Sequence, residues 1–129
     1  MGDRANVILK GSDNVGSEIA LYTHWNGSEV EKIIAVGLKR AIDGGRNTDQ
    51  SYAQRIIAQA FFDAHGVTDT GAGLYVGPAY EPHVVVVDFD EQTVTFDPQA
   101  REYGTEGEEP TTAPFADFLA LFLEVPSTV

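Results

Sequence analysis

The strongest strand signal in this chain is the run of four valines at residues 84–87. β-branched side chains favour extended backbone, and a strand that is apolar at every position has no face suited to water. The run therefore predicts a strand over residues 83–88, buried on both faces at the centre of a sheet. Residues 93–96 alternate between polar and apolar side chains. They predict a second strand that pairs back across the turn at residues 90–92 as a hairpin.

Other periodic segments predict the remaining helices and strands. Alternating or short apolar runs bounded by turn residues indicate strands, and apolar residues at helical spacing indicate helices. Further strands are expected at residues 5–10, 18–25 and 74–76, and helices at residues 29–43, 50–65 and 113–125. The first two strands should form an antiparallel hairpin.

The predicted fold is α+β, with the element order β-β-α-α-β-β-β-α in a single domain over residues 1–129. The sheet should have about five strands, mostly antiparallel, with three helices over one face. Residues 97–112 have no period and are rich in Glu, Gly and Pro, which predicts a mobile acidic loop. The last helix carries a stripe of phenylalanines that must dock on the sheet or on another subunit: Phe115, Phe118 and Phe122.

Two patterns in the helix at residues 29–43 carry specific expectations. Ser28 and Glu31 fit the S-x-x-E capping box, in which two side chains bond the backbone amides at a helix start. Gly37 lowers helix propensity within the apolar stripe of this helix. A glycine kept at such a position favours a close packing contact.

The formal net charge of −12 is concentrated in the second half of the chain. Residues 1–60 hold seven basic and seven acidic residues, whereas residues 61–129 hold thirteen acidic residues and only Arg101 as a basic one. This distribution argues against a general nucleic-acid or anionic-membrane surface, but it permits a local anion site in the first half. An acidic surface with few lysines is also typical of adaptation to high salt. The chain has no cysteine and no apolar run near the ~20 residues of a membrane span, so we expect a cytoplasmic protein.

Two short motifs carry a resemblance to a known family. They are Gly-Asp-Arg-Ala-Asn-Val at residues 2–7 and Leu-Tyr-Thr-His-Trp at residues 21–25. Together they resemble a family of small uncharacterised bacterial and phage proteins, over about a quarter of the chain. The resemblance brings no activity with it. It implies that the two motifs belong together, and that a phage-encoded member would act in the host cytoplasm.

A hairpin would bring these motifs side by side, because early residues of the first strand lie opposite late residues of the second. The candidate ligand site consists of six side chains from the two motifs: Asp3, Arg4, Asn6, Tyr22, His24 and Trp25. In this site Arg4 would hold an anion, Trp25 would stack on a planar ligand, and His24 would donate or transfer a proton. The helix that follows would add free backbone N–H groups and a partial positive charge.

The same side chains also fit a structural interpretation. Asp3 would then pair with Arg4 or another neighbour and hold the N-terminal segment. Trp25 would be part of the core, and His24 would hydrogen-bond the turn. Both interpretations stay open at the level of the sequence.

Catalytic and metal-binding patterns are weak. The chain has no G-x-S-x-G elbow, and Ser28 is expected to cap a helix and not to act as a nucleophile. The three histidines, His24, His65 and His83, lack the spacing of metal ligands. The carboxylates at residues 88–91 lack the glycine and closing glutamate of a calcium loop. The sequence therefore predicts no catalytic residues, no metal and no cofactor.

Three functions are consistent with these observations. The first is a non-enzymatic binding module for a small polar or anionic, nucleotide-like ligand. The second is a protein-interaction or accessory structural protein, acting through the helix at residues 113–125 and the acidic surface. In that case Phe115, Phe118 and Phe122 would form a homo-oligomer contact. The third is a small hydrolase that uses His24 with Asp3.

Overall fold

The computed structural model describes residues 3–66, 68–96 and 110–123. The elements in chain order are β1 Ala5–Lys10, the 3-10 turn η1 Ser12–Asn14, β2 Ile19–Thr23, the 3-10 turn η2 Gly27–Glu29, α1 Val30–Asp43, α2 Gln50–His65, β3 Ala72–Val76, β4 Val84–Asp88, β5 Thr93–Phe96, β6 Thr111–Pro114 and α3 Phe115–Leu123. The α+β class and the order of the predicted elements are confirmed, and β6 is an additional strand. Within these ranges no helix is long and apolar enough to cross a bilayer.

The strands of the described part form one six-stranded sheet in the order β3-β2-β1-β4-β5-β6. The predicted hairpins β1–β2 and β4–β5 are confirmed, and the valine strand β4 lies between β1 and β5 as expected. The predicted burial on both faces is wrong, because Val85 and Val87 are buried whereas Val84 and Val86 are only partly buried. β1 and β4 run parallel, so the sheet is mixed and not purely antiparallel. The direction of this pair depends on the route of the chain between two distant segments, which no local pattern encodes.

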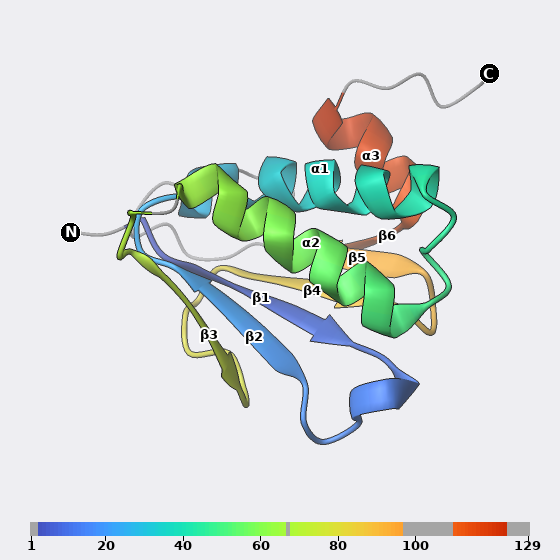
Figure 1. Cartoon of the computed structure of the whole chain (residues 1–129), viewed down its shortest axis with the longest axis horizontal. Helices are drawn as coiled ribbons and strands as arrows, with labels where there is room; N and C mark the ends of the chain where they lie inside the picture. Colours follow the sequence, from blue (N-terminus) through green and yellow to red (C-terminus); the bar gives the residue numbers. More distant parts are fainter. Residues whose placement is uncertain (1–2, 67, 97–109, 124–129) are drawn as a thin grey trace.

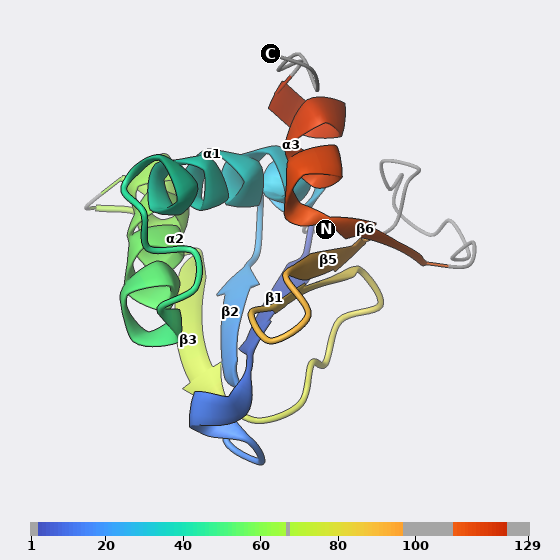
Figure 2. The same cartoon turned by 90° about the vertical axis from the view of Figure 1, so that its right-hand side faces the viewer.

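The helices α1 and α2 cover one face of the sheet, and α3 packs beside α1 (Figures 1 and 2). Alternate side chains of the central strands point into this layer. Val7, Leu9, Val85 and Val87 are completely buried there, together with Leu38 of α1. Burying a side chain of this size contributes about 1.5–3 kcal/mol to the stability of the fold.

Gly37 lies where α1 meets α2. A Cβ at this position would be 2.9 Å from Cα of Ile57 and 3.1 Å from Cβ of Ala60. The close contact predicted from the sequence is confirmed, because only a residue without a side chain lets the two helices approach this closely.

Replacing Gly37 by alanine is expected to lower the free energy of unfolding by about 1–2 kcal/mol. Crowding against the α2 backbone outweighs the gain of about 1 kcal/mol in helix propensity. Urea unfolding followed by circular dichroism measures the difference. Gly73→Ala is the control, since a Cβ there meets nothing within 4 Å; equal losses at both positions would contradict the packing argument.

Tyr52 stands at the edge of the apolar stripe of α2 and lies on the surface. Tyr52 is 50% exposed, and Cζ of Arg46 lies 4.4 Å from the centre of its ring. Position 52 borders the buried stripe, and a ring at that edge can turn toward solvent, where a cation–π contact stabilises it.

The segment before α3 also differs from its prediction. Residues 111–114 pair with β5 as the edge strand β6, and α3 begins at Phe115 and not at residue 113. Pro114 is compatible with this assignment because proline is tolerated on edge strands. Most of the loop predicted at residues 97–112 and the last two residues of the predicted helix lie outside the described residues.

The phenylalanine stripe of α3 packs into the core of its own chain. Phe118 is completely buried and Phe115 is 5% exposed. The ring of Phe96 on β5 lies 5.2 Å from that of Phe118 and 5.3 Å from that of Phe122, both nearly edge-on. The helix therefore docks on the sheet, and Phe115 and Phe118 are not available to a second subunit in this conformation.

Candidate functional site

Several elements begin or end at one end of the sheet, on the left in Figure 1. β1 begins there and β2 ends there because the two are antiparallel, and β4 begins there because it is parallel to β1. α1 follows directly after β2, and α2 ends beside it, where His65 contacts Thr23. All six predicted site residues lie in β1, in β2 or directly next to them at this end.

Asp3 closes the turn between β2 and α1. Its backbone N–H donates to the carbonyl of His24 at 2.8 Å, and its own carbonyl accepts from the N–H of Gly27 at 2.7 Å. Its carboxylate accepts from the N–H of Ser28 at 2.8 Å. Asp3 therefore has the structural role foreseen as the alternative, holding the N-terminal segment against the start of α1.

The predicted capping box is wrong. α1 begins at Val30 with Glu29 as its N-cap, and the N-cap side chain makes no capping bond. The N–H of Ser28 is bound by Asp3, and the Glu31 carboxylate points to His83. A carboxylate of the chain itself thus occupies part of the amide-rich position that the sequence offered to an anionic ligand.

Asn6 has a structural role in the sheet. It is completely buried. Its Nδ2 donates to the carbonyl of Leu21 at 3.2 Å, and its Oδ1 accepts from the N–H of Tyr80 at 2.8 Å and of Glu81 at 3.0 Å. These bonds hold the segment that leads from β3 to β4, which crosses the sheet on the side away from α1 and α2 (Figure 2). Asn6 thereby supplies the acceptor that two backbone donors of the crossing segment need.

The aromatic residues at the end of β2 form a connected surface group. The Tyr22 hydroxyl lies 3.1 Å from Nδ1 of His24, and the His24 ring meets the Trp25 ring edge-on, with centroids 5.0 Å apart. Trp25 is 52% exposed and packs over Gly71, where a Cβ would lie 2.0 Å from its ring. The indole therefore has a fixed orientation and presents apolar surface to solvent.

Arg4 lies in the N-terminal segment that runs along the end of β2. The regular register ends at the pair Ala5↔Thr23, and the next bond, from Asp3 N to His24 O, shifts the pairing by one residue. The Arg4 side chain is exposed, and no residue of the described ranges forms an ion pair with it. We call Arg4, Tyr22, His24 and Trp25 the Trp25 corner.

A second histidine joins α2 to the end of β2. Nδ1 of His65 lies 2.8 Å from the carbonyl of Phe61, so it must carry a proton, and Nε2 lies 2.8 Å from the Thr23 hydroxyl oxygen. The Thr23 oxygen in turn accepts from the N–H of Asn26 at 3.1 Å. A threonine next to a histidine can act as a nucleophile, but Thr23 is completely buried. The chain of bonds is therefore a structural link.

The third histidine forms a buried pair that the sequence did not suggest. Nε2 of His83 lies 2.7 Å from Oε2 of Glu31, and both side chains are 5% exposed. Nδ1 of His83 is buried and has no hydrogen-bond partner among the described residues. Glu31 lies in the first turn of α1, where the helix dipole favours a negative charge.

A signal for this pair was present in the sequence. Glu31 stands three, four and seven residues before the buried Ile34, Ala35 and Leu38, so it occupies the apolar stripe of α1. A carboxylate in such a stripe requires a buried partner. The sequence could not identify that partner, because His83 is 52 residues away.

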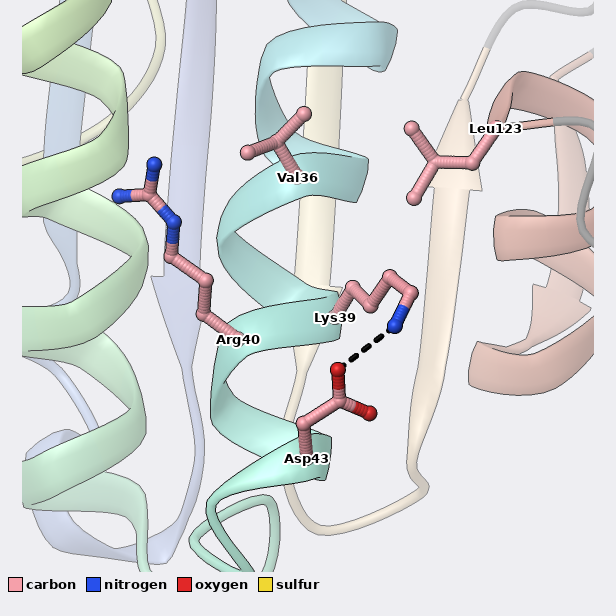
Figure 3. A pocket seen from close by; sticks show the side chains of 5 residues that line it. All are labelled: Val36, Lys39, Arg40, Asp43 and Leu123. Carbon is pink, nitrogen blue, oxygen red and sulfur yellow. Dashed lines mark hydrogen bonds and ion pairs between the residues drawn. The ribbon is translucent and has the colours of Figure 1, made fainter.

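A groove of about 340 Å³ lies between α1 and α3. Figure 3 shows Leu123 of α3 pointing toward α1, where Val36 lines the groove and Nζ of Lys39 bonds the Asp43 carboxylate at 2.6 Å. Arg40 completes its lining. None of the residues predicted for ligand binding lines this groove.

Of the six predicted site residues, four form the Trp25 corner, and Asp3 and Asn6 hold the backbone around it. The corner combines an exposed aromatic face with an exposed guanidinium, which suits a ligand that is planar and anionic. Within the described ranges, no group of three or more histidine, aspartate and glutamate side chains is arranged to hold a metal ion. In comparisons with protein-family models, with curated proteins and with solved structures, the chain has no significant match.

Proposed function

We propose that the protein is a non-enzymatic binding module, and that the Trp25 corner holds a small planar anion such as a nucleotide. The observation that supports this proposal is the half-exposed Trp25 ring, held in place by Gly71 and His24. The exposed Arg4 lies in the segment whose backbone bonds the end of β2. An ordered indole loses little entropy on binding, so stacking of a base on it stabilises a complex by about 1–3 kcal/mol.

Arg4 supplies the charge complementarity. A guanidinium binds phosphate or carboxylate through paired hydrogen bonds, and these are stronger than bonds between neutral groups. The start of α1 contributes less than the sequence suggested, since Asp3 already accepts the bond from Ser28 N. Anion recognition at this corner therefore depends on Arg4.

The contacts of His24 favour binding over hydrolysis. Its ring bonds the phenol of Tyr22, and the Asp3 carboxylate that would have oriented it bonds Ser28 N instead. A general base needs both a nucleophile within hydrogen-bond reach and an orienting group. Among the contacts of the described residues, His24 has the Tyr22 hydroxyl as its hydrogen-bond partner and no carboxylate to orient it.

The binding test uses Trp25 as the reporter, because it is the one tryptophan of the chain. Titration with adenosine and guanosine mono- and triphosphates should quench or shift its fluorescence in a saturable manner. Inorganic phosphate separates charge from stacking, since it offers no ring and should bind far more weakly. No saturable change with any of these nucleotides at millimolar concentration would contradict the proposal.

Arg4→Gln is expected to weaken nucleotide binding about tenfold or more, because one charge-assisted contact is lost. Calorimetry or fluorescence measures the dissociation constant. Arg55→Gln is the matched control: Arg55 is also exposed, and its guanidinium contacts Gln59 on α2. Equal weakening by both substitutions would indicate a nonspecific charge effect and exclude Arg4 as the anion contact.

A further inference from the structure

The edge strand β3 has unused backbone hydrogen-bonding groups in a defined pattern. Two bonds set that pattern: His24 N donates to Gly71 O at 2.8 Å, and Gly77 N donates to Glu18 O at 3.2 Å. Hydrogen-bonded pairs alternate along an antiparallel ladder. The residues of this segment that bond β2 are therefore Gly71, Gly73, Tyr75 and Gly77.

The intervening residues Ala72, Leu74 and Val76 direct their N–H and C=O groups away from the sheet. No strand of the described part pairs with this side of β3. Leu74 is 56% exposed and Val76 is 62% exposed, and both side chains lie on the same face of the strand. Six backbone groups and two apolar side chains are thus presented together.

The edge also lacks the usual protection against pairing. Natural edge strands carry lysine, proline or inward-pointing charges that prevent contact with another strand. From Thr70 to Tyr80 the chain has eleven consecutive residues without a charge, although its net charge is −12. Pro78 follows the strand and does not interrupt it.

We propose that β3 is a dimerisation edge, at which a second copy of this chain pairs antiparallel with β3 about a twofold axis at Leu74. Such an interface is isologous, so the same strand serves both subunits. It would join the two six-stranded sheets into one continuous sheet.

This register satisfies every outward-facing group. Leu74 lies opposite its own counterpart, and Ala72 lies opposite Val76 of the second copy. All three pairs are hydrogen-bonded pairs, which accounts for the six free N–H and C=O groups. On the other face Tyr75 lies opposite Gly73, a combination in which an aromatic ring covers a glycine.

The self-complementary register favours a second copy as the occupant, and the edge carries no charge that would oppose it. Two chains of net charge −12 repel each other over most of their surface. The β3 edge is an uncharged stretch where they can approach without placing like charges opposite each other. An acidic chain therefore has a self-complementary contact here that does not require a basic partner.

The first test is the mass in solution, measured by sedimentation at 10–500 µM, a range of about fiftyfold around typical dimer affinities. The chain of 13.9 kDa is expected to approach twice that mass. Leu74→Lys should raise the dissociation constant at least about tenfold, because it places two like charges at the axis. Leu121→Lys is the matched control, since Leu121 is also an exposed leucine, on α3. A monomer at every concentration, or a dimer that Leu74→Lys leaves intact, would overturn the proposal.

The second test fixes the register by disulfide trapping, which is clean because the sequence has no cysteine. Two copies of Leu74→Cys face each other about 5.5 Å apart between Cα atoms, within disulfide range, and should cross-link under mild oxidation. Two copies of Val76→Cys would be about 14 Å apart and should not. Equal cross-linking of both variants would exclude the twofold axis at Leu74. Binding of an extended peptide to a strictly monomeric chain would assign the edge to another partner and reject the dimer. Neither test depends on nucleotide binding at the Trp25 corner.

Discussion

Replacing Asn6 by alanine is expected to lower the free energy of unfolding by about 3 kcal/mol, although Asn6 is one small side chain on a strand. The substitution removes the only acceptor that the described residues offer to the N–H groups of Tyr80 and Glu81, and the donor to Leu21 O. A buried polar group left without a partner costs about 1–3 kcal/mol, and a small cavity adds to this loss. Urea unfolding gives the free energy, and hydrogen exchange should show faster exchange at Tyr80 and Glu81.

Asn26→Ala is the control for this experiment. Asn26 is partly buried, and it contributes its backbone N–H and not its side chain to the bond with Thr23. Its substitution should change stability by no more than about 0.5 kcal/mol. If Asn6→Ala costs no more than Asn26→Ala, Asn6 does not hold the segment between β3 and β4, and it returns to the list of candidate ligand contacts.

Glu31→Ala is expected to destabilise the protein by about 3–5 kcal/mol. The variant leaves the buried Nε2 of His83 without its acceptor at 2.7 Å, and an uncompensated polar group in the interior is the costly part of a broken pair. Glu31→Gln should cost less, because an amide oxygen can still accept a bond from the imidazole. Chemical unfolding of both variants distinguishes a lost acceptor from a lost charge.

A double-mutant cycle tests whether the two side chains act as a pair. The sum of the losses in Glu31→Ala and His83→Ala should exceed the loss in the double variant by about 1–3 kcal/mol. Glu91→Ala serves as the surface reference, since Glu91 is exposed and its side chain has no described ion pair. Additive losses would show that Glu31 and His83 stabilise the fold independently.

Helices and strands with strong local periodicity were predicted well. The bounds of α2 and β5 agree with the predicted ranges, and α1 differs by one residue at its start. Apolar residues recur about every 3.6 residues in a helix and every 2 residues in a strand because these positions face the core. This spacing can therefore be recognised in the sequence alone. The hairpin of β1 and β2 could also be predicted, because a short turn leaves two neighbouring strands few other ways to pair.

Features that depend on distant segments were not predicted. β6 is a short strand, Thr111–Pro114, with little periodicity of its own, and it exists because β5 offers it an edge. The parallel pairing of β1 with β4 needs the segment that crosses from β3, and that segment needs Asn6. From the sequence, Asn6 was a candidate ligand contact, and its bonds to the crossing segment were not foreseen.

The candidate site also has features that the local sequence predicted and features that depend on distant segments. The meeting of the Asp3–Arg4 segment with His24 and Trp25 follows from the hairpin register, and the structure places them together. Three hydrogen bonds could be found only from the tertiary structure. They join Asp3 to Ser28 N, Glu31 to His83, and Asn6 to the segment that crosses from β3 to β4.

From its sequence alone this chain specified where helices and strands form, which faces are apolar and which two motifs adjoin, because those properties depend on neighbours within a few residues or across one turn. Only the tertiary structure decided the direction of β4 relative to β1, the presence of the sixth strand and the partner of each buried polar side chain. A polar group taken out of water must find its hydrogen-bond partner in space, and that partner can come from any part of the chain.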